Sequence, residues 1–147
     1  MTRKGHSPDA GRAEGDRLKA DALALLEARR EVFIRRGRRA LLQTMFDGDG
    51  TATADDVRAA VTLPADMDPR CLGTVPGRLG YDRIIRPAGR IRTRRPEAHA
   101  RWIDRWALAD QAAALRWLAD HPDLPDPGAD QGDGQQRVLF QTHPITH

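Results

Sequence analysis

The sequence predicts a mainly α-helical domain with one small β-hairpin. Three observations support this class: helically spaced apolar residues before residue 62, a second helix start at Asp68-Pro69, and an arginine-rich two-stranded ribbon over residues 81–108. Helix, helix and basic hairpin, in this order, are typical of a winged helix-turn-helix domain. The pattern adds a long N-terminal helix before this domain and a short C-terminal helix after it.

The length of 147 residues suits one domain with irregular ends. Residues 1–16 and 122–147 are rich in Gly, Pro, Asp and Gln, and they lack the periodic apolar residues that would offset the entropy lost on ordering. We therefore expect a disordered N-terminal arm over 1–16, a folded domain over 17–121 and a disordered acidic tail over 122–147.

The composition also predicts in which compartment the protein works. No stretch approaches the roughly 18 apolar residues of a membrane span, and no apolar segment follows the N-terminal charges. The single cysteine, Cys71, excludes an internal disulfide framework and a cysteine-rich zinc site. We expect a soluble, cytoplasmic protein without a cofactor.

The N-terminal third predicts two helical segments. Apolar residues recur at near-helical spacing from about residue 13 to 36, where a break near Arg30 is an open alternative. Gly37 then allows a break, and residues 38–46 either form a second helix or continue the first. The turn-forming residues 47–50 end that segment.

Three further helices are indicated by their start signals. Thr53 is a suitable N-cap for a helix that runs to about residue 61 or 62. Asp68 and Pro69 begin a helix that Pro76-Gly77 interrupts, so either the helix kinks there or a short turn over 69–73 precedes a helix that begins near Pro76. The last helix spans residues 110–119.

Positive charge is concentrated in the region of the ribbon. Residues 69–106 carry ten arginines and three acidic residues, whereas residues 47–68 carry one basic and six acidic residues. A basic half-domain between acidic segments favours binding of a polyanion on one face. A high-GC genome explains the excess of Arg over Lys equally well, but it does not explain the clustering.

The helix over 69–81 and the ribbon are the main candidates for contact with nucleic acid. In a winged helix, the second helix of the pair enters the major groove and the wing lies on the backbone or in the minor groove. The candidate DNA-binding residues are Arg70 and Arg78 in the helix, with Arg90, Arg92, Arg94, Arg95, His99 and Arg101 in the ribbon. His99 donates to a phosphate or, alternatively, fixes the wing by bonding a backbone carbonyl. The alternative for the whole set is a solvated hairpin or a protein-binding hairpin.

The ribbon also carries a resemblance to a known family. The run Ile84-Ile85-Arg86-Pro87-Ala88-Gly89, followed by residues 95–101 (RPEAHAR) and Trp106, resembles small winged helix-turn-helix proteins of bacteriophages and high-GC bacteria. The chain differs from the family pattern at Thr93-Arg94, Ala100 and Asp104-Arg105. The resemblance covers roughly residues 35–110, and it implies binding to DNA without an enzymatic activity or a ligand.

Other chemistry finds little support in the sequence. Residues 47–57 are similar to the middle of a calcium-binding EF-hand loop, but the first ligand position falls on Met45 and the bidentate Glu is missing. A turn followed by a capped helix explains the same residues. The only Ser lies near the N-terminus and the five His are scattered, so the pattern predicts no catalytic triad and no metal site.

The C-terminal tail contains one short motif. Gln136, Leu139 and Phe140 fit a Gln-x-x-Leu-Phe pattern that resembles the peptide by which bacterial proteins bind the sliding clamp. A chance match and an intramolecular apolar patch are the alternatives.

Taken with the charge pattern, the sequence favours an accessory or regulatory protein of phage or bacterial DNA metabolism that binds double-stranded DNA. The alternative is a protein-interaction adaptor whose tail binds the sliding clamp. The sequence leaves the oligomeric state open.

Overall fold

The computed structural model describes residues 8–129, which are mainly helical with a small antiparallel sheet. The chain divides into two units. The larger unit consists of residues 31–124, and the smaller one combines residues 1–30 with residues 125–147, of which 8–30 and 125–129 are described. Helix α1 (Pro8–Asp47) supplies residues to both units.

Helix α1 is longer than the sequence predicts. It begins at Pro8, so the expectation of disorder is wrong for residues 8–16, and residues 1–7 lie outside the described residues. It also continues through Gly37, so of the two alternatives that the sequence leaves open, residues 38–46 continue the first helix. Gly37 is explained by packing instead, because a Cβ built on it would lie 2.6 Å from Cγ2 of Val75 and 3.3 Å from Cδ2 of Leu72.

A short strand and a capped helix follow α1. Strand β1 (Thr51–Thr53) leads directly into α2 (Ala54–Ala60). The predicted N-cap at Thr53 is confirmed: its hydroxyl accepts from the N–H of Asp55, and its own N–H donates to the Asp56 carboxylate over 2.8 Å. This reciprocal pair satisfies N–H groups that a helix start would otherwise leave without partners. The sequence did not indicate β1, which is only three residues long.

The segment around Pro76 adopts the second of the two predicted arrangements. A 3₁₀ helix, η1 (Pro69–Thr74), is capped by the Asp68 side chain and precedes helix α3 (Val75–Tyr81). Val75 and Leu79 are buried on the inner face of α3. Proline at the start of α3 needs no amide donor there, so Pro76 begins the helix rather than breaking it.

The three strands form one antiparallel sheet in the order β1-β3-β2. Strand β2 (Ile85–Arg92) and strand β3 (Trp102–Leu108) form the predicted hairpin, with Ile85 opposite Leu108 and Arg92 opposite Trp102. The pairing is irregular between residues 87 and 90, where Gly89 has a φ of +92°. The strand extends past this irregularity, so Arg90 and Arg92 lie in β2 and the hairpin loop is residues 93–101.

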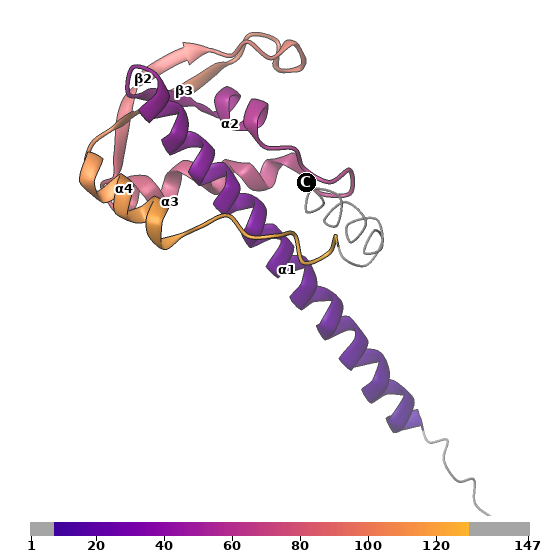
Figure 1. Ribbon diagram of the computed structural model, residues 1–147. Coiled ribbons are helices and arrows are strands. Elements are labelled where there is room, and N and C mark those ends of the chain that lie inside the picture. The colour runs from indigo at the N-terminus through magenta and orange to yellow at the C-terminus, as the bar shows by residue number, and fades with distance from the viewer. Residues whose placement is uncertain (1–7, 130–147) are drawn as a thin grey trace, which may run out of the picture. The chain divides into compact units, whose positions relative to one another are not determined.

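The core of the larger unit lies between α1, α3, the sheet and α4 (Gln111–Asp120). Figure 1 shows the arrangement of these elements. Asp110 caps the start of α4 through a bond from the N–H of Ala113. Of the three tryptophans, Trp117 is buried and Trp106 packs against the core, whereas Trp102 is half exposed. The best-buried large side chains come from α1, α3 and β2: Leu41, Leu42, Met45, Leu79, Ile85 and Val75.

Arginines of α1 hold the chain that follows α4. Arg39 donates to the carbonyl oxygens of Leu118 and His121, both at 2.8 Å. Arg35 donates to the carbonyl of Pro122, and Arg36 pairs with Asp123 at 2.9 Å. Part of the positive charge near the N-terminus is therefore used inside the larger unit, which extends to residue 124, beyond the predicted end at 121.

The smaller unit contains a comparable contact. Arg29 donates from Nε and Nη2 to the two carboxylate oxygens of Asp126, at 3.0 and 3.1 Å. Both side chains are largely buried, at 15% and 12% exposure. Residues 122–129, which the sequence predicts to be disordered, thus make specific contacts within their units. Among residues 8–129, no helix combines the length and the apolar character needed to cross a membrane.

Candidate nucleic-acid interface

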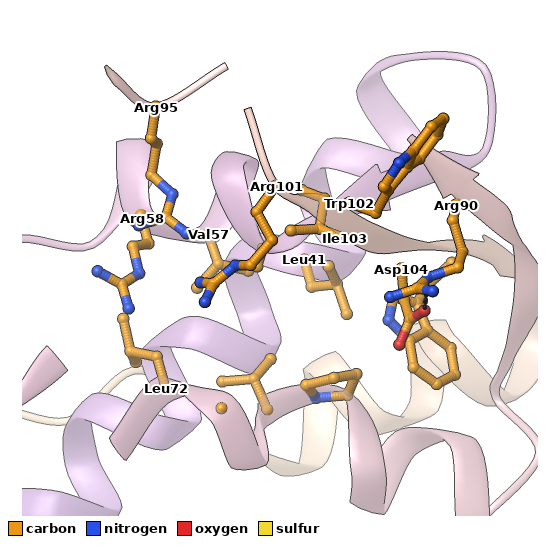
Figure 2. A pocket seen from close by; sticks show the side chains of 15 residues that line it. Leu41, Val57, Arg58, Leu72, Arg90, Arg95, Arg101, Trp102, Ile103 and Asp104 are labelled. Atoms are coloured by element: carbon orange, nitrogen blue, oxygen red, sulfur yellow. Dashed lines mark ion pairs between the residues drawn. The ribbon is translucent and has the colours of Figure 1, made fainter. Parts of the chain in front are cut away.

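A pocket of about 340 Å³ opens between α2, the start of α3 and the β2–β3 hairpin (Figure 2). Its floor is apolar and includes Leu41, Val57 and Leu72, which belong to the core. Its remaining wall is rich in cations. The arginines that line it come from four parts of the fold, namely α2, β2 and both ends of the hairpin loop: Arg58, Arg90, Arg95 and Arg101.

The hairpin loop beside this pocket is fixed to α2 by one carboxylate. Asp55 accepts from the Thr93 hydroxyl at 2.7 Å, from the Arg94 N–H at 2.8 Å and from Nε of Arg95 at 2.8 Å. Three donors from consecutive residues thus converge on one side chain in the first turn of α2. The start of the hairpin loop is therefore held against α2.

The environment of Asp55 favours its ionised form. Partial burial acts to raise the pKa of Asp55, but the hydrogen bonds from Arg94, Thr93 and Arg95 outweigh it and leave the pKa below its ordinary value of 3.8. The carboxylate is therefore charged at neutral pH and neutralises Arg95, whose side chain is only 17% exposed. Arg95 lines the pocket mainly as a structural cation.

Two other arginines of the pocket are free to contact a ligand. Figure 2 shows the Arg101 side chain extending from the hairpin loop into the pocket, with Arg58 of α2 across from it. Within residues 8–129, neither guanidinium makes a hydrogen bond or an ion pair. Arg94 is exposed at the same end of the hairpin and, in the described part of the chain, its side chain also has no such partner.

Two further arginines of the predicted set, Arg90 and Arg92, lie on β2. Arg90 is 3.4 Å from Asp104 on β3, with both side chains more than 60% exposed, so this pair is weak. Arg92 places its guanidinium 4.7 Å from the centre of the Trp102 ring and donates to the carbonyl of Ala100. The Trp102 ring at the pocket edge is 49% exposed, so an exposed aromatic face and a cation lie together.

The helical candidates lie on the outer surface. Arg78 projects from α3, pairs with Asp82 at 3.1 Å and lies 5.8 Å from the centre of the Tyr81 ring. Arg70 is in η1, and its guanidinium pairs with Asp68 at 2.7 Å and lowers the pKa of that carboxyl to about 2. Both arginines are exposed, but each has an acidic neighbour that a phosphate would have to replace.

His99 does not fix the hairpin as the sequence suggests. The residue is exposed, and its backbone adopts the left-handed helical conformation with φ of 53°. Its backbone N–H donates to the carbonyl of Pro96. Within residues 8–129 its imidazole makes no hydrogen bond. The proposed clamp-binding residues Gln136, Leu139 and Phe140 lie outside the described residues.

The structure therefore brings together Arg90, Arg95 and Arg101 of the predicted set and leaves Arg70, Arg78 and His99 outside the pocket. Two participants were not predicted from the sequence. Arg58 was missed because it lies in an acidic stretch, and Asp55 was interpreted only as a helix-start residue. No sequence signal connects Asp55 to a loop some forty residues later, because that contact depends on the tertiary fold.

Comparison with known proteins adds no relative: no family model, no curated protein and no solved structure gives a significant match to the chain.

Proposed function

We propose that residues 31–124 form a winged helix-turn-helix module that binds double-stranded DNA, with α3 as the recognition helix and the β2–β3 hairpin as the wing. The protein acts as an accessory or regulatory factor in phage or bacterial DNA metabolism. The observation that carries the proposal is the arginine-lined pocket between α3 and the hairpin.

The order of elements supports the proposed module. Helix, short strand, two helices and a hairpin follow one another, and the first strand pairs with the last one to give the order β1-β3-β2. In a winged helix-turn-helix domain, the second helix of the pair and the wing contact the same duplex. Here the loop of the hairpin lies beside α2 (Figure 1), and the pocket is lined by both α3 and the hairpin.

The chemistry of the surface supports a polyanion as the ligand. Among residues 8–129, the guanidinium groups of Arg58, Arg94 and Arg101 make no hydrogen bond or ion pair with an acidic side chain, and arginine binds phosphate oxygens in a bidentate manner. The exposed Arg92–Trp102 pair adds a ring and a cation at the edge of the pocket. Because the start of the hairpin loop is fixed by Asp55, binding costs less ordering entropy than it would for a free loop.

The test is the salt dependence of binding to a short duplex. Each phosphate contact releases counterions, so the logarithm of the binding constant falls linearly with the logarithm of the salt concentration. Arg101→Ala and Arg58→Ala should each reduce this slope by roughly one unit on all duplex sequences. Arg116→Ala is the matched control, because Arg116 is an exposed arginine of α4 outside the pocket.

A slope that is unchanged in both pocket variants would contradict the proposal. So would the absence of any salt-dependent binding to duplex, and that result would favour the protein-adaptor alternative.

A further inference from the structure

The smaller unit contains an apolar helix face that the described residues leave exposed. Leu18, Ala22, Leu25 and Leu26 recur at helical spacing and lie on one face of α1, which we call the leucine stripe. Leu18 and Leu26 are 56% and 54% exposed. Helices in proteins owe most of their stability to packing of an apolar face, so an uncovered leucine face leaves this part of α1 without that support.

The C-terminal chain already contacts α1 at one end of this stripe. Arg29 is eleven residues after Leu18 and lies on the same face of the helix, where Asp126 holds it through two hydrogen bonds. Gly128 lies so close to the Arg29 guanidinium that a Cβ at this position would collide with it. The side chain of Asp126 and the backbone of Gly128 therefore both contact Arg29 of α1.

The segment beyond residue 129 has suitable chemistry and enough length. In an otherwise polar stretch it contains Val138-Leu139-Phe140, the strongest apolar cluster between residue 130 and the end of the sequence. Ten residues from 129 to 139 span up to about 33 Å when extended. The stripe extends only about 17 Å from Arg29 to Leu18, at 1.5 Å per helical residue.

We propose that residues 138–140 dock on the leucine stripe of α1 within the same chain. The Arg29–Asp126 pair anchors the returning chain, and burial of Leu139 and Phe140 against Leu18, Ala22 and Leu25 covers the exposed face. The anchor limits the volume that the tail explores, which raises the effective concentration of the apolar cluster near the stripe.

Disulfide trapping in the full chain tests this docking. Ala22→Cys is combined with Val138→Cys, which keeps Leu139 and Phe140, and the products of mild oxidation are mapped by mass spectrometry under non-reducing conditions. The expected result is an intramolecular 22–138 disulfide in a monomer. The matched control combines Ala24→Cys with Val138→Cys, because Ala24 is also exposed but lies on the opposite side of the helix.

Equal trapping from both faces would overturn the proposal. Disulfides between Ala22→Cys residues of two molecules would also overturn it and would assign the stripe to a second copy of the chain. Native Cys71 is buried and is present in both variants, so it does not distinguish them.

Amide hydrogen exchange gives a second readout that needs no introduced cysteine. Leu139→Ser with Phe140→Ser should accelerate exchange at residues 18–26 by about tenfold, which corresponds to roughly 1.4 kcal/mol. Thr142→Ser is the control and should leave the rates unchanged. Unchanged rates in the double variant, at a protein concentration where the chain is monomeric, would show that the tail does not cover the stripe.

Discussion

The Asp55 carboxylate and the Arg95 guanidinium form an ion pair of 2.8 Å that joins the first turn of α2 to the hairpin loop. Their side chains are 10% and 17% exposed, so solvent screens the pair far less than it screens the surface pairs of this protein. Asp55 also accepts from Thr93 and from the backbone of Arg94. One side chain of α2 therefore fixes the start of the hairpin loop, in addition to the pairing of β1 with β3.

Asp55→Asn should lower the free energy of unfolding by about 1–3 kcal/mol, because it leaves Arg95 with only its longer pair to the exposed Glu97, at 3.4 Å, and turns one accepting oxygen into a donor. Urea unfolding followed by circular dichroism measures the loss. Asp104→Asn is the matched control, since its pair with Arg90 is longer and exposed, and it should cost less than about 0.5 kcal/mol. Equal losses in the two variants would contradict the anchoring role of Asp55.

The Asp55 carboxyl group should also make the stability of the fold depend on pH. Hydrogen bonds hold the pKa of Asp55 in the folded state below its ordinary value of 3.8, although burial opposes them. The carboxyl of Asp55 therefore binds a proton more tightly in the unfolded state than in the folded state. The stabilisation that ionised Asp55 gives to the fold is complete above its ordinary pKa, and it is lost as the pH falls through its pKa in the folded state. The difference in stability between the native protein and Asp55→Asn should be constant near pH 7 and shrink below about pH 4. A difference that is constant down to pH 2.5 would disprove this coupling.

Gly37→Ala should destabilise the protein by about 1–3 kcal/mol, although alanine favours helices. The new Cβ would lie 2.6 Å from Cγ2 of Val75, a stiff β-branched side chain that is fully buried. Gly11→Ala is the control in the same helix, because within residues 8–129 no atom beyond the adjacent helix backbone lies within 4 Å of its Cβ position, and it should be stabilising by up to about 1 kcal/mol. Thermal unfolding of both variants gives the signs, and a stabilised Gly37→Ala would show that α1 and α3 are not closely packed.

Arg78→Ala tests the role proposed for α3. If Arg78 reads a base edge, its loss should weaken binding to a preferred duplex by about 1–3 kcal/mol at one base pair and should change non-specific binding much less. Competition binding with a randomised duplex library measures the discrimination. Arg70→Ala is a useful comparison, because Arg70 is also exposed and paired with an aspartate but lies in η1. A uniform loss on all sequences would make Arg78 a phosphate contact instead.

Local signals in the sequence predicted the starts of α2, η1 and α4 correctly, but not the start of α1 at Pro8. The caps at Thr53, Asp68 and Asp110 use side chains that bond the adjacent backbone, so a few residues contain the whole signal. The hairpin was predicted for a related reason, because apolar residues at Ile84-Ile85 and Trp102–Trp106 flank turn-forming residues. The third strand was not predicted, since three residues of β1 owe their conformation to pairing with β3.

Tertiary contacts explain the errors. Gly37 was interpreted as a residue that allows a helix break, but the structure explains the glycine by the close approach of Val75, which is almost forty residues away in the chain. The arginines were grouped as one cationic surface because sequence does not show which are neutralised, and Asp55 removes Arg95 from that group. Arg58 joins the pocket only through the packing of α2 beside the hairpin. The charge pattern located the region of the candidate site and three of its arginines, but it did not indicate Arg58 or Asp55.

The irregularity of β2 has a consequence for self-association through the sheet. β2 is an edge strand, and Pro87 in its middle has no N–H to offer to a strand of another molecule. The irregular pairing between residues 87 and 90 follows it directly, where Arg105 donates to the carbonyl of Ala88 and occupies a further backbone group. The opposite edge, β1, is only three residues long. Both borders of the sheet are therefore poor templates for strand addition, which protects this domain from edge-to-edge aggregation while its hairpin stays accessible.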